Sequence, residues 1–134
     1  MKKINLGRQH LVEFYGCCAE TINDKDRIRE VMLEAARLAK ATIVADVFHE
    51  FNPHGISGVV VIAESHIALH SWPEHLCASV DIFSCSEEMK PDLAIEYLKT
   101  VFKAKEIDIQ VILRGQVPGT LDKSPSCQGP KPSR

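Results

Sequence analysis

The highest density of reactive side chains in this chain of 134 residues lies between positions 64 and 74. The segment holds two hydroxyls, two imidazoles, an indole and two carboxylates, contributed by Ser65, Ser71, His66, His70, Trp72, Glu64 and Glu74. Two kinds of chemistry fit these residue types directly. The imidazoles could bind a metal ion, and the serine could act as the nucleophile of a hydrolase.

The spacing of the two histidines argues against a metal site. His66 and His70 are four residues apart, and the segment alternates apolar and polar residues up to Pro73, which indicates a strand. Four residues of strand span roughly 13 Å. Two imidazoles so far apart cannot both lie about 2 Å from one zinc ion. We therefore expect no metal here.

A conventional serine hydrolase is also poorly supported. Ser65 lacks the Gly-x-Ser-x-Gly pattern that places a nucleophile on a sharp turn. A serine near a histidine and an acid is common by chance, and a serine at a turn or strand end is the ordinary interpretation.

The bulk composition limits the class of protein. The length favours one domain. A net charge of -2, a pI near 6.3 and scattered Lys and Arg argue against nucleic-acid or anionic membrane partners. The apolar runs are too short to span a bilayer, and residues 1–6 lack the apolar segment of a signal peptide. No two of the five cysteines show the C-x-x-C spacing of zinc-binding or thioredoxin-type motifs. We expect a cytoplasmic protein, and because the cytosol is reducing, we expect most of its cysteines to be free thiols.

The elements that position the reactive segment can be predicted from periodicity. Helical spacing of apolar residues covers 26–40, and Pro91 fits the first turn of a second helix. Strands are expected at 8–16, 41–51, 58–63, 66–72, 78–84 and 107–113. Short turns between the middle strands favour antiparallel pairing. The prediction is an α+β fold: a two-layer sandwich of an antiparallel β-sheet with two helices on one face.

Two further expectations follow from this arrangement. The sheet face without helices needs a cover, and a second copy is the simplest one, so we expect a homodimer formed sheet to sheet. Four of the seven prolines fall after Gly115, among Gly, Ser and Lys. We therefore expect one domain over 1–114 and a disordered tail over 115–134.

Three motifs in order resemble a known family. They are 55–66, with Glu-Ser-His at its end, 70–74, which reads His-Ser-Trp-Pro-Glu, and 78–85, which ends in Cys85; Gly7-Arg8, His10-Leu11 and Phe48-His49 add to them. Together they closely resemble the small prokaryotic S-adenosylmethionine decarboxylase proenzymes over roughly 7–114. The resemblance implies a pyruvoyl-dependent enzyme that converts S-adenosylmethionine to its decarboxylated form and CO2 for spermidine and other polyamines.

The resemblance also implies self-processing. Ser65 would attack the carbonyl carbon of Glu64 and form an ester, a base would remove the α-hydrogen, and β-elimination would break the chain. The resulting dehydroalanine hydrolyses to a pyruvoyl group and ammonia, leaving a β chain of 1–64 and an α chain of 65–134. In this family pattern His70 is the processing base, Ser57 its helper and Cys85 the proton donor in decarboxylation. The pyruvoyl carbonyl forms a Schiff base with the substrate amine and acts as the electron sink.

The substrate contacts implied by the resemblance are aromatic and acidic. Phe51 and Trp72 are candidates to contact the adenine and the sulfonium charge. Glu74 is the candidate for the ribose hydroxyls, and Glu13 is a further candidate in the first strand. Core packing for the aromatic pair, and a solvated strand position for Glu13, are the ordinary alternatives.

Geometry adds a constraint that the motifs do not contain. Ser65 and His70 are five residues apart, roughly 16 Å along an extended strand. A base must approach within about 3 Å of its proton, or act through one water. We therefore predict two composite sites in a dimer of processed protomers, a heterotetramer of two β and two α chains. Ser65 and Cys85 would come from one protomer, and Ser57 and His70 from its partner.

Several positions differ from the family pattern and keep alternatives open. Ser86 follows Cys85 where the family has Gly, Leu76-Cys77 replaces Gly-Tyr, and Gln9 is an extra residue. None of these changes removes a reacting group. The alternatives are the same pyruvoyl chemistry on L-arginine or L-ornithine, or an unprocessed homologue that binds a ligand without catalysis.

Overall fold

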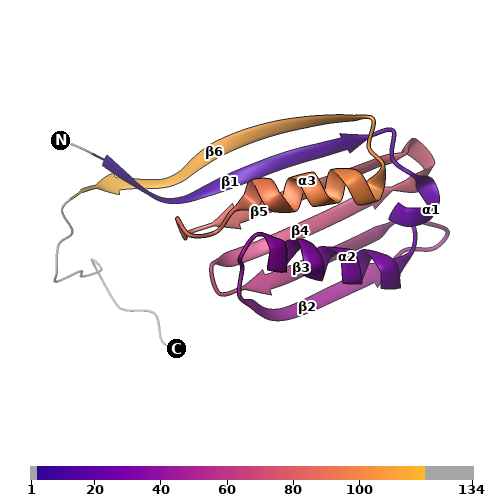
Figure 1. Ribbon diagram of the computed structural model, residues 1–134, viewed down its shortest axis with the longest axis horizontal. Helices are drawn as coiled ribbons and strands as arrows, with labels where there is room; N and C mark the ends of the chain where they lie inside the picture. The colour runs from indigo at the N-terminus through magenta and orange to yellow at the C-terminus, as the bar shows by residue number, and fades with distance from the viewer. Residues whose placement is uncertain (1–2, 120–134) are drawn as a thin grey trace, which may run out of the picture.

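The computed structural model describes residues 3–119 and shows six antiparallel strands with helices packed on one face (Figure 1). The strand order across the sheet is β2-β3-β4-β5-β1-β6. The elements are β1 (Lys3–Tyr15), α1 (Ala19–Ile22), α2 (Lys25–Leu38), β2 (Ile43–Glu50), β3 (Ile56–Ile62), β4 (Ser65–Trp72), the 3-10 helix η1 (Pro73–His75), β5 (Cys77–Ser84), α3 (Pro91–Phe102) and β6 (Glu106–Pro118).

The two long helices form where capping and periodicity favour them. The Asp24 side chain accepts a hydrogen bond from the Arg27 N–H at 3.1 Å and so caps α2. α3 begins with Pro91, whose missing N–H costs nothing in a first turn. The apolar stripe of each helix is buried against the sheet, through Ile28, Val31, Met32, Ala35, Ala94, Ile95, Leu98 and Phe102.

Strand alternation gives the sheet one buried and one open face. In β5, Ala78, Val80 and Ile82 are fully buried beneath the helices, while the residues between them are partly exposed. Within residues 3–119 no helix covers the other face, which we call the open face. The hydrophobic core therefore lies between the sheet and the helices. None of the helices in this part of the chain is long and apolar enough to cross a membrane.

The predicted α+β class and two-layer arrangement are confirmed, with corrections at the ends of the sheet. β1 begins at Lys3, before the expected residue 8, and β6 runs to Pro118, beyond the expected residue 113. The two strands pair along their whole length, from Lys3 opposite Pro118 to Tyr15 opposite Glu106. Residues 115–118, expected in the tail, instead continue β6. Residues 120–134 lie outside the described residues.

Candidate active site

The bond between Glu64 and Ser65 lies in a tight hairpin at one end of the sheet. Ile62 of β3 pairs with Ser65 of β4, so only Ala63 and Glu64 form the turn. The backbone of Ser65 has φ +154°, a conformation that residues with a side chain rarely adopt. Strain of this kind is common at functional sites, and here it falls on the residue that follows the bond.

Cys85 lies beside this bond because β5 ends next to the start of β4. Ser84 pairs with Ser65, and the N–H of Cys85 donates a hydrogen bond of 3.1 Å to the carbonyl oxygen of Glu64. A donor on a carbonyl oxygen stabilises the negative charge that develops when a nucleophile attacks the carbonyl carbon. The Cys85 thiol belongs to an exposed residue. The structure thus brings Glu64, Ser65 and Cys85 together within one protomer.

Thr42 anchors the hairpin from the start of β2. Its N–H and its hydroxyl donate to the two carboxylate oxygens of Glu64, at 3.0 Å and 3.2 Å. These bonds, first that from the N–H, lower the pKa of Glu64. The N–H of Ala63 donates in turn to the Thr42 carbonyl at 2.8 Å. Sequence reasoning missed Thr42, since nothing in the sequence links positions 42 and 64.

Ser57 and His70 face each other near the opposite end of the β3–β4 hairpin. They are cross-strand partners, and the Ser57 hydroxyl lies 2.8 Å from His70 Nδ1. The His70 side chain is exposed on the open face. The predicted processing base and its helper are therefore already hydrogen-bonded to each other.

This pair belongs to a row of polar side chains that crosses the open face. Successive cross-strand pairs place one residue from each strand in a line: His49, Ser57, His70, Ser79, Glu13 and Asp108. The Ser79 hydroxyl donates to the Glu13 carboxylate in a short hydrogen bond. Glu13 therefore lies in the row that contains His70. His49 and Ser79 were missed because membership of the row depends on strand register.

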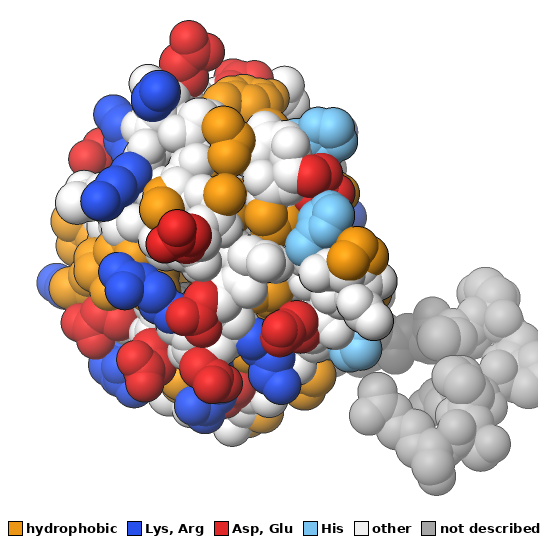
Figure 2. All heavy atoms as spheres, turned by 90° about the vertical axis from the view of Figure 1, so that its right-hand side faces the viewer, with side chains coloured by type: hydrophobic (Ala, Val, Ile, Leu, Met, Phe, Trp, Pro, Cys, Tyr) orange, Lys and Arg blue, Asp and Glu red, His pale blue; other side chains and the backbone are white. Residues whose placement is uncertain are grey.

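The aromatic candidates lie next to this row. Trp72 and Phe51 are both about half exposed, so neither is a core residue. The Trp72 ring centroid lies 6.4 Å from that of His70, and the Phe51 ring lies 4.6 Å from that of His49. Figure 2 views the molecule at this end of the sheet and shows several histidine side chains on one side of it.

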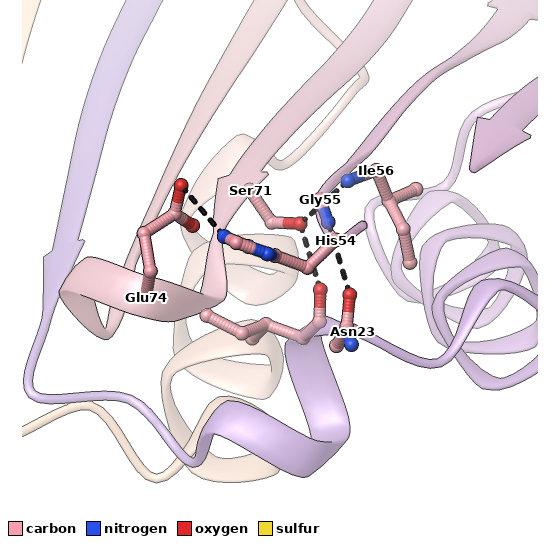
Figure 3. Close-up of polar contacts among 7 residues, drawn as sticks. Asn23, His54, Gly55, Ile56, Ser71 and Glu74 are labelled. Carbon is pink, nitrogen blue, oxygen red and sulfur yellow. Dashed lines mark hydrogen bonds and ion pairs between the residues drawn. The ribbon is translucent and has the colours of Figure 1, made fainter. Parts of the chain in front are cut away.

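Glu74 is held by a residue that sequence reasoning did not select. Its carboxylate lies 3.1 Å from His54 Nε2, between η1 and the β2–β3 turn (Figure 3). Two backbone hydrogen bonds of 3.0 Å hold the β2–β3 turn in place. The Gly55 N–H donates to the Asn23 side-chain oxygen, and the Ile56 N–H donates to the Ser71 hydroxyl oxygen. His54 thus fixes the position of the candidate carboxylate for a ribose.

The candidate residues form two groups that one protomer does not bring together. Ser65 and His70 begin and nearly end the same strand, β4, which confirms the extended geometry. Five residues of strand correspond to about 16 Å. The His70 ring of one protomer therefore does not reach the Glu64–Ser65 bond of the same protomer.

Comparisons with known proteins identify the family of this chain. A family model described as S-adenosylmethionine decarboxylase matches residues 8–115. The S-adenosylmethionine decarboxylase proenzyme of Acidithiobacillus ferrooxidans is 46% identical over 113 residues, covering 84% of this chain and 85% of that protein. The proenzyme of Moorella thermoacetica is 47% identical over 112 residues, covering 84% and 90%.

A solved structure supports the same family assignment. The crystal structure of the adenosylmethionine decarboxylase from Aquifex aeolicus superimposes with a TM-score of 0.81 at 38% identity, covering 89% of this chain and 98% of that one. The family match includes the hairpin at Glu64–Ser65, Cys85 and the polar row. On these grounds the chain belongs to the S-adenosylmethionine decarboxylase family.

Proposed function

We propose that this protein is a self-processing decarboxylase that converts S-adenosylmethionine to its decarboxylated form and CO2, a product that serves as aminopropyl donor for spermidine and other polyamines. The observation that carries the proposal is the Glu64–Ser65 bond, whose carbonyl accepts a hydrogen bond from Cys85 where the Ser65 backbone is strained. The relatives are named as proenzymes, which agrees with a chain that must be processed.

The processing step needs groups of this chain, a base and one water molecule. The Ser65 hydroxyl oxygen bonds to the Glu64 carbonyl carbon, the C–N bond breaks, and an ester replaces the amide. Removal of the Ser65 α-hydrogen then breaks the bond from Cβ to oxygen and frees the Glu64 carboxylate. One water enters and one ammonia leaves as the new α-chain terminus becomes a pyruvoyl group. The Cys85 N–H supports the first step, because it binds the oxygen that gains negative charge.

The surroundings of Ser65 fit a pyruvoyl group. The serine is the first residue of β4, so the new terminus would remain on a strand paired with β5 on its other side. A pyruvoyl group supplies a carbonyl that can accept an amine and withdraw electrons. Ser84 pairs with Ser65, so Cys85 is the residue that follows the partner of the new terminus. Its exposed thiol is our candidate to deliver the proton that replaces CO2.

We propose that the second group of residues acts on the partner protomer. The distance along β4 is too long for His70 to act as the base on Ser65 of the same protomer. The open face carries the exposed His70 side chain, which a partner protomer could contact. Two copies related by a two-fold axis would form two equivalent sites. Each would combine Ser65 and Cys85 of one protomer with Ser57 and His70 of the other.

The substrate contacts follow the same division. We propose that Phe51 and Trp72 contact the adenine and that Glu74, positioned by His54, accepts hydrogen bonds from the ribose hydroxyls. Glu13 bonds to Ser79 in the row of His70, which supports a contact near the reacting centre. A cytoplasmic location and the dimer remain predictions.

One experiment separates this proposal from its alternatives. Intact mass of the purified protein shows whether the chain is cleaved before Ser65, and a single full-length species contradicts self-processing. Release of labelled CO2 from S-adenosylmethionine, L-arginine and L-ornithine then identifies the substrate. Release from arginine or ornithine alone would overturn the proposed substrate while retaining the mechanism.

A further inference from the structure

The turn that carries Cys85 is closed by the side chain of the residue before it. Ser84 is the last residue of β5 and is only 6% exposed. Its hydroxyl donates to the Ser86 carbonyl oxygen at 3.0 Å and accepts from the Ser86 N–H at 3.2 Å. Both bonds reach the residue on the far side of Cys85. The Ser84 hydroxyl therefore holds the backbone of Cys85 in a tight turn.

Ser84 also connects this turn to the residue that would carry the cofactor. It pairs with Ser65 of β4 on one side and with Arg8 of β1 on the other. The backbone of Ser84 is therefore held between two strands, whereas Cys85 lies just beyond the last pair with β4. The position of the Cys85 thiol relative to Ser65 thus depends on how the chain turns after Ser84.

The hydrogen bond from the Cys85 N–H to the Glu64 carbonyl cannot provide this connection after processing. Cleavage separates Glu64 from Ser65, so that bond no longer links Cys85 to the new terminus. The two bonds of the Ser84 hydroxyl involve neither Glu64 nor the bond that breaks. They lie wholly within the α chain, 65–134, and are therefore independent of cleavage.

The surroundings of Cys85 leave a need for such a restraint. The residue is exposed and lies in the wall of a groove of about 440 Å³, together with Ser84, Ser86 and Arg8. Packing is therefore open on one side of the thiol. An acid transfers its proton only when it lies within hydrogen-bond reach of the reacting atom. The closed turn supplies a restraint that the open groove does not.

We propose that Ser84 is a positioning residue for the proton donor Cys85. The inference rests on the proposed function, in which the Cys85 thiol supplies the proton that replaces CO2. The Ser84 hydroxyl is bonded to the backbone of its own turn, so it acts through Cys85 and not on the substrate. Its loss should slow proton transfer and leave substrate binding unchanged.

The kinetic test compares Ser84→Ala with Ser84→Thr in the processed enzyme. Ser84→Ala removes both bonds, so we expect kcat to fall about tenfold with KM unchanged, as part of the larger factor that a positioned acid contributes. Ser84→Thr keeps a hydroxyl and should restore kcat. An unchanged kcat in Ser84→Ala, or an equal loss in Ser84→Thr, overturns the proposal.

The neighbouring serine supplies the matched control. The Ser86 hydroxyl accepts from the Glu88 N–H at 3.1 Å, and Ser84 contacts only the backbone of Ser86. Ser86→Ala therefore removes a hydroxyl from the same turn while keeping both bonds of Ser84, and we expect its kcat to be nearly unchanged. An equal loss of kcat in Ser86→Ala and Ser84→Ala overturns the assignment to Ser84.

A double-mutant cycle shows whether Ser84 acts through Cys85. In a Cys85→Ala background there is no thiol to position, so adding Ser84→Ala should lower kcat by less than about twofold. A full tenfold loss in that background would show that the hydroxyl acts by another route, and it would overturn the proposal.

Hydrogen exchange tests the turn independently of activity and without a change at Ser84. We expect the Ser86 N–H to be protected from exchange both in the uncleaved Ser65→Ala protein and in the processed enzyme, because its partner is the Ser84 hydroxyl in each. Rapid exchange in either protein overturns the proposal. Wild-type protein that neither cleaves itself nor releases CO2 would instead overturn the proposed function, and this inference with it, even if the Ser86 N–H is protected.

Discussion

The backbone N–H of Cys85 and the carbonyl oxygen of Glu64 are joined by a hydrogen bond of 3.1 Å, although the two residues are separated by the whole of β4 and β5. The bond exists because Ser84 and Ser65 pair at the ends of those strands. One residue, Cys85, thereby offers two different groups to the same site. Its N–H contacts the bond that must break, and its thiol is the candidate proton donor for the later reaction.

These two roles of Cys85 can be separated by mutation. Cys85→Ala keeps the N–H, so we expect self-cleavage to continue while CO2 release falls by about 10² or more, the usual contribution of a positioned acid. Cys85→Pro removes the N–H, and we expect cleavage itself to slow. Gel analysis of processing and a labelled-CO2 assay measure the two steps. Cys77→Ala is the matched control, and loss of cleavage in Cys85→Ala would contradict the assignment.

The composite site predicts complementation between two inactive chains. Ser65→Ala and His70→Ala are each expected to remain uncleaved when expressed alone. When they are co-expressed, His70 of the first chain can serve Ser65 of the second. With random pairing of equal amounts, about half of the His70→Ala chains should be cleaved.

A histidine on the same strand supplies the control for this experiment. His66 lies four residues before His70 and on the same face of β4, so His66→Ala tests for a general effect of losing an imidazole there. We expect the His66→Ala protein to be cleaved when it is expressed alone. Complete absence of cleavage in the co-expressed Ser65→Ala and His70→Ala chains would show that the base does not come from a partner.

The Glu64 side chain predicts a pH-dependent contribution to stability. Hydrogen bonds from Thr42 lower the pKa of this carboxyl in the folded protein, so its ionised form is favoured by folding. The contribution is fully present above the pKa of the unfolded chain, about 4.3, and is lost as pH falls through the lower folded value. Thermal unfolding of the unprocessed Ser65→Ala protein and of Ser65→Ala with Glu64→Gln should differ at pH 7. The difference should shrink below about pH 4, and a constant difference would contradict this account.

The exposed aromatic side chains predict a change in substrate binding with little change in stability. Trp72→Ala removes a half-exposed ring, so we expect a small change in melting temperature. Loss of one stacking contact, worth about 1 kcal/mol, should raise KM for S-adenosylmethionine about fivefold. Leu76→Ala is a control, because this large apolar side chain is similarly exposed nearby. An unchanged KM in Trp72→Ala would exclude the contact.

The elements of the fold could be predicted from local sequence because each signal is contained within one segment. Apolar spacing in α2 and alternation in β5 depend only on neighbouring residues, and both correspond to buried faces in the structure. The ends of β1 and β6 could not be predicted in this way. Their outer halves are mostly exposed, and each is held as strand chiefly by pairing with the other.

The candidate site was also predictable from the sequence only in part. The sequence by itself determined which residues could react, and the length of one extended segment was enough to separate Ser65 from His70. The structure decided what lies beside each of them: Cys85 and Thr42 at the hairpin, and Ser79 and Glu13 in the polar row. These contacts depend on the register between strands distant in sequence. Register is set by the packing of the whole sheet against its helices, so only the tertiary structure could supply it.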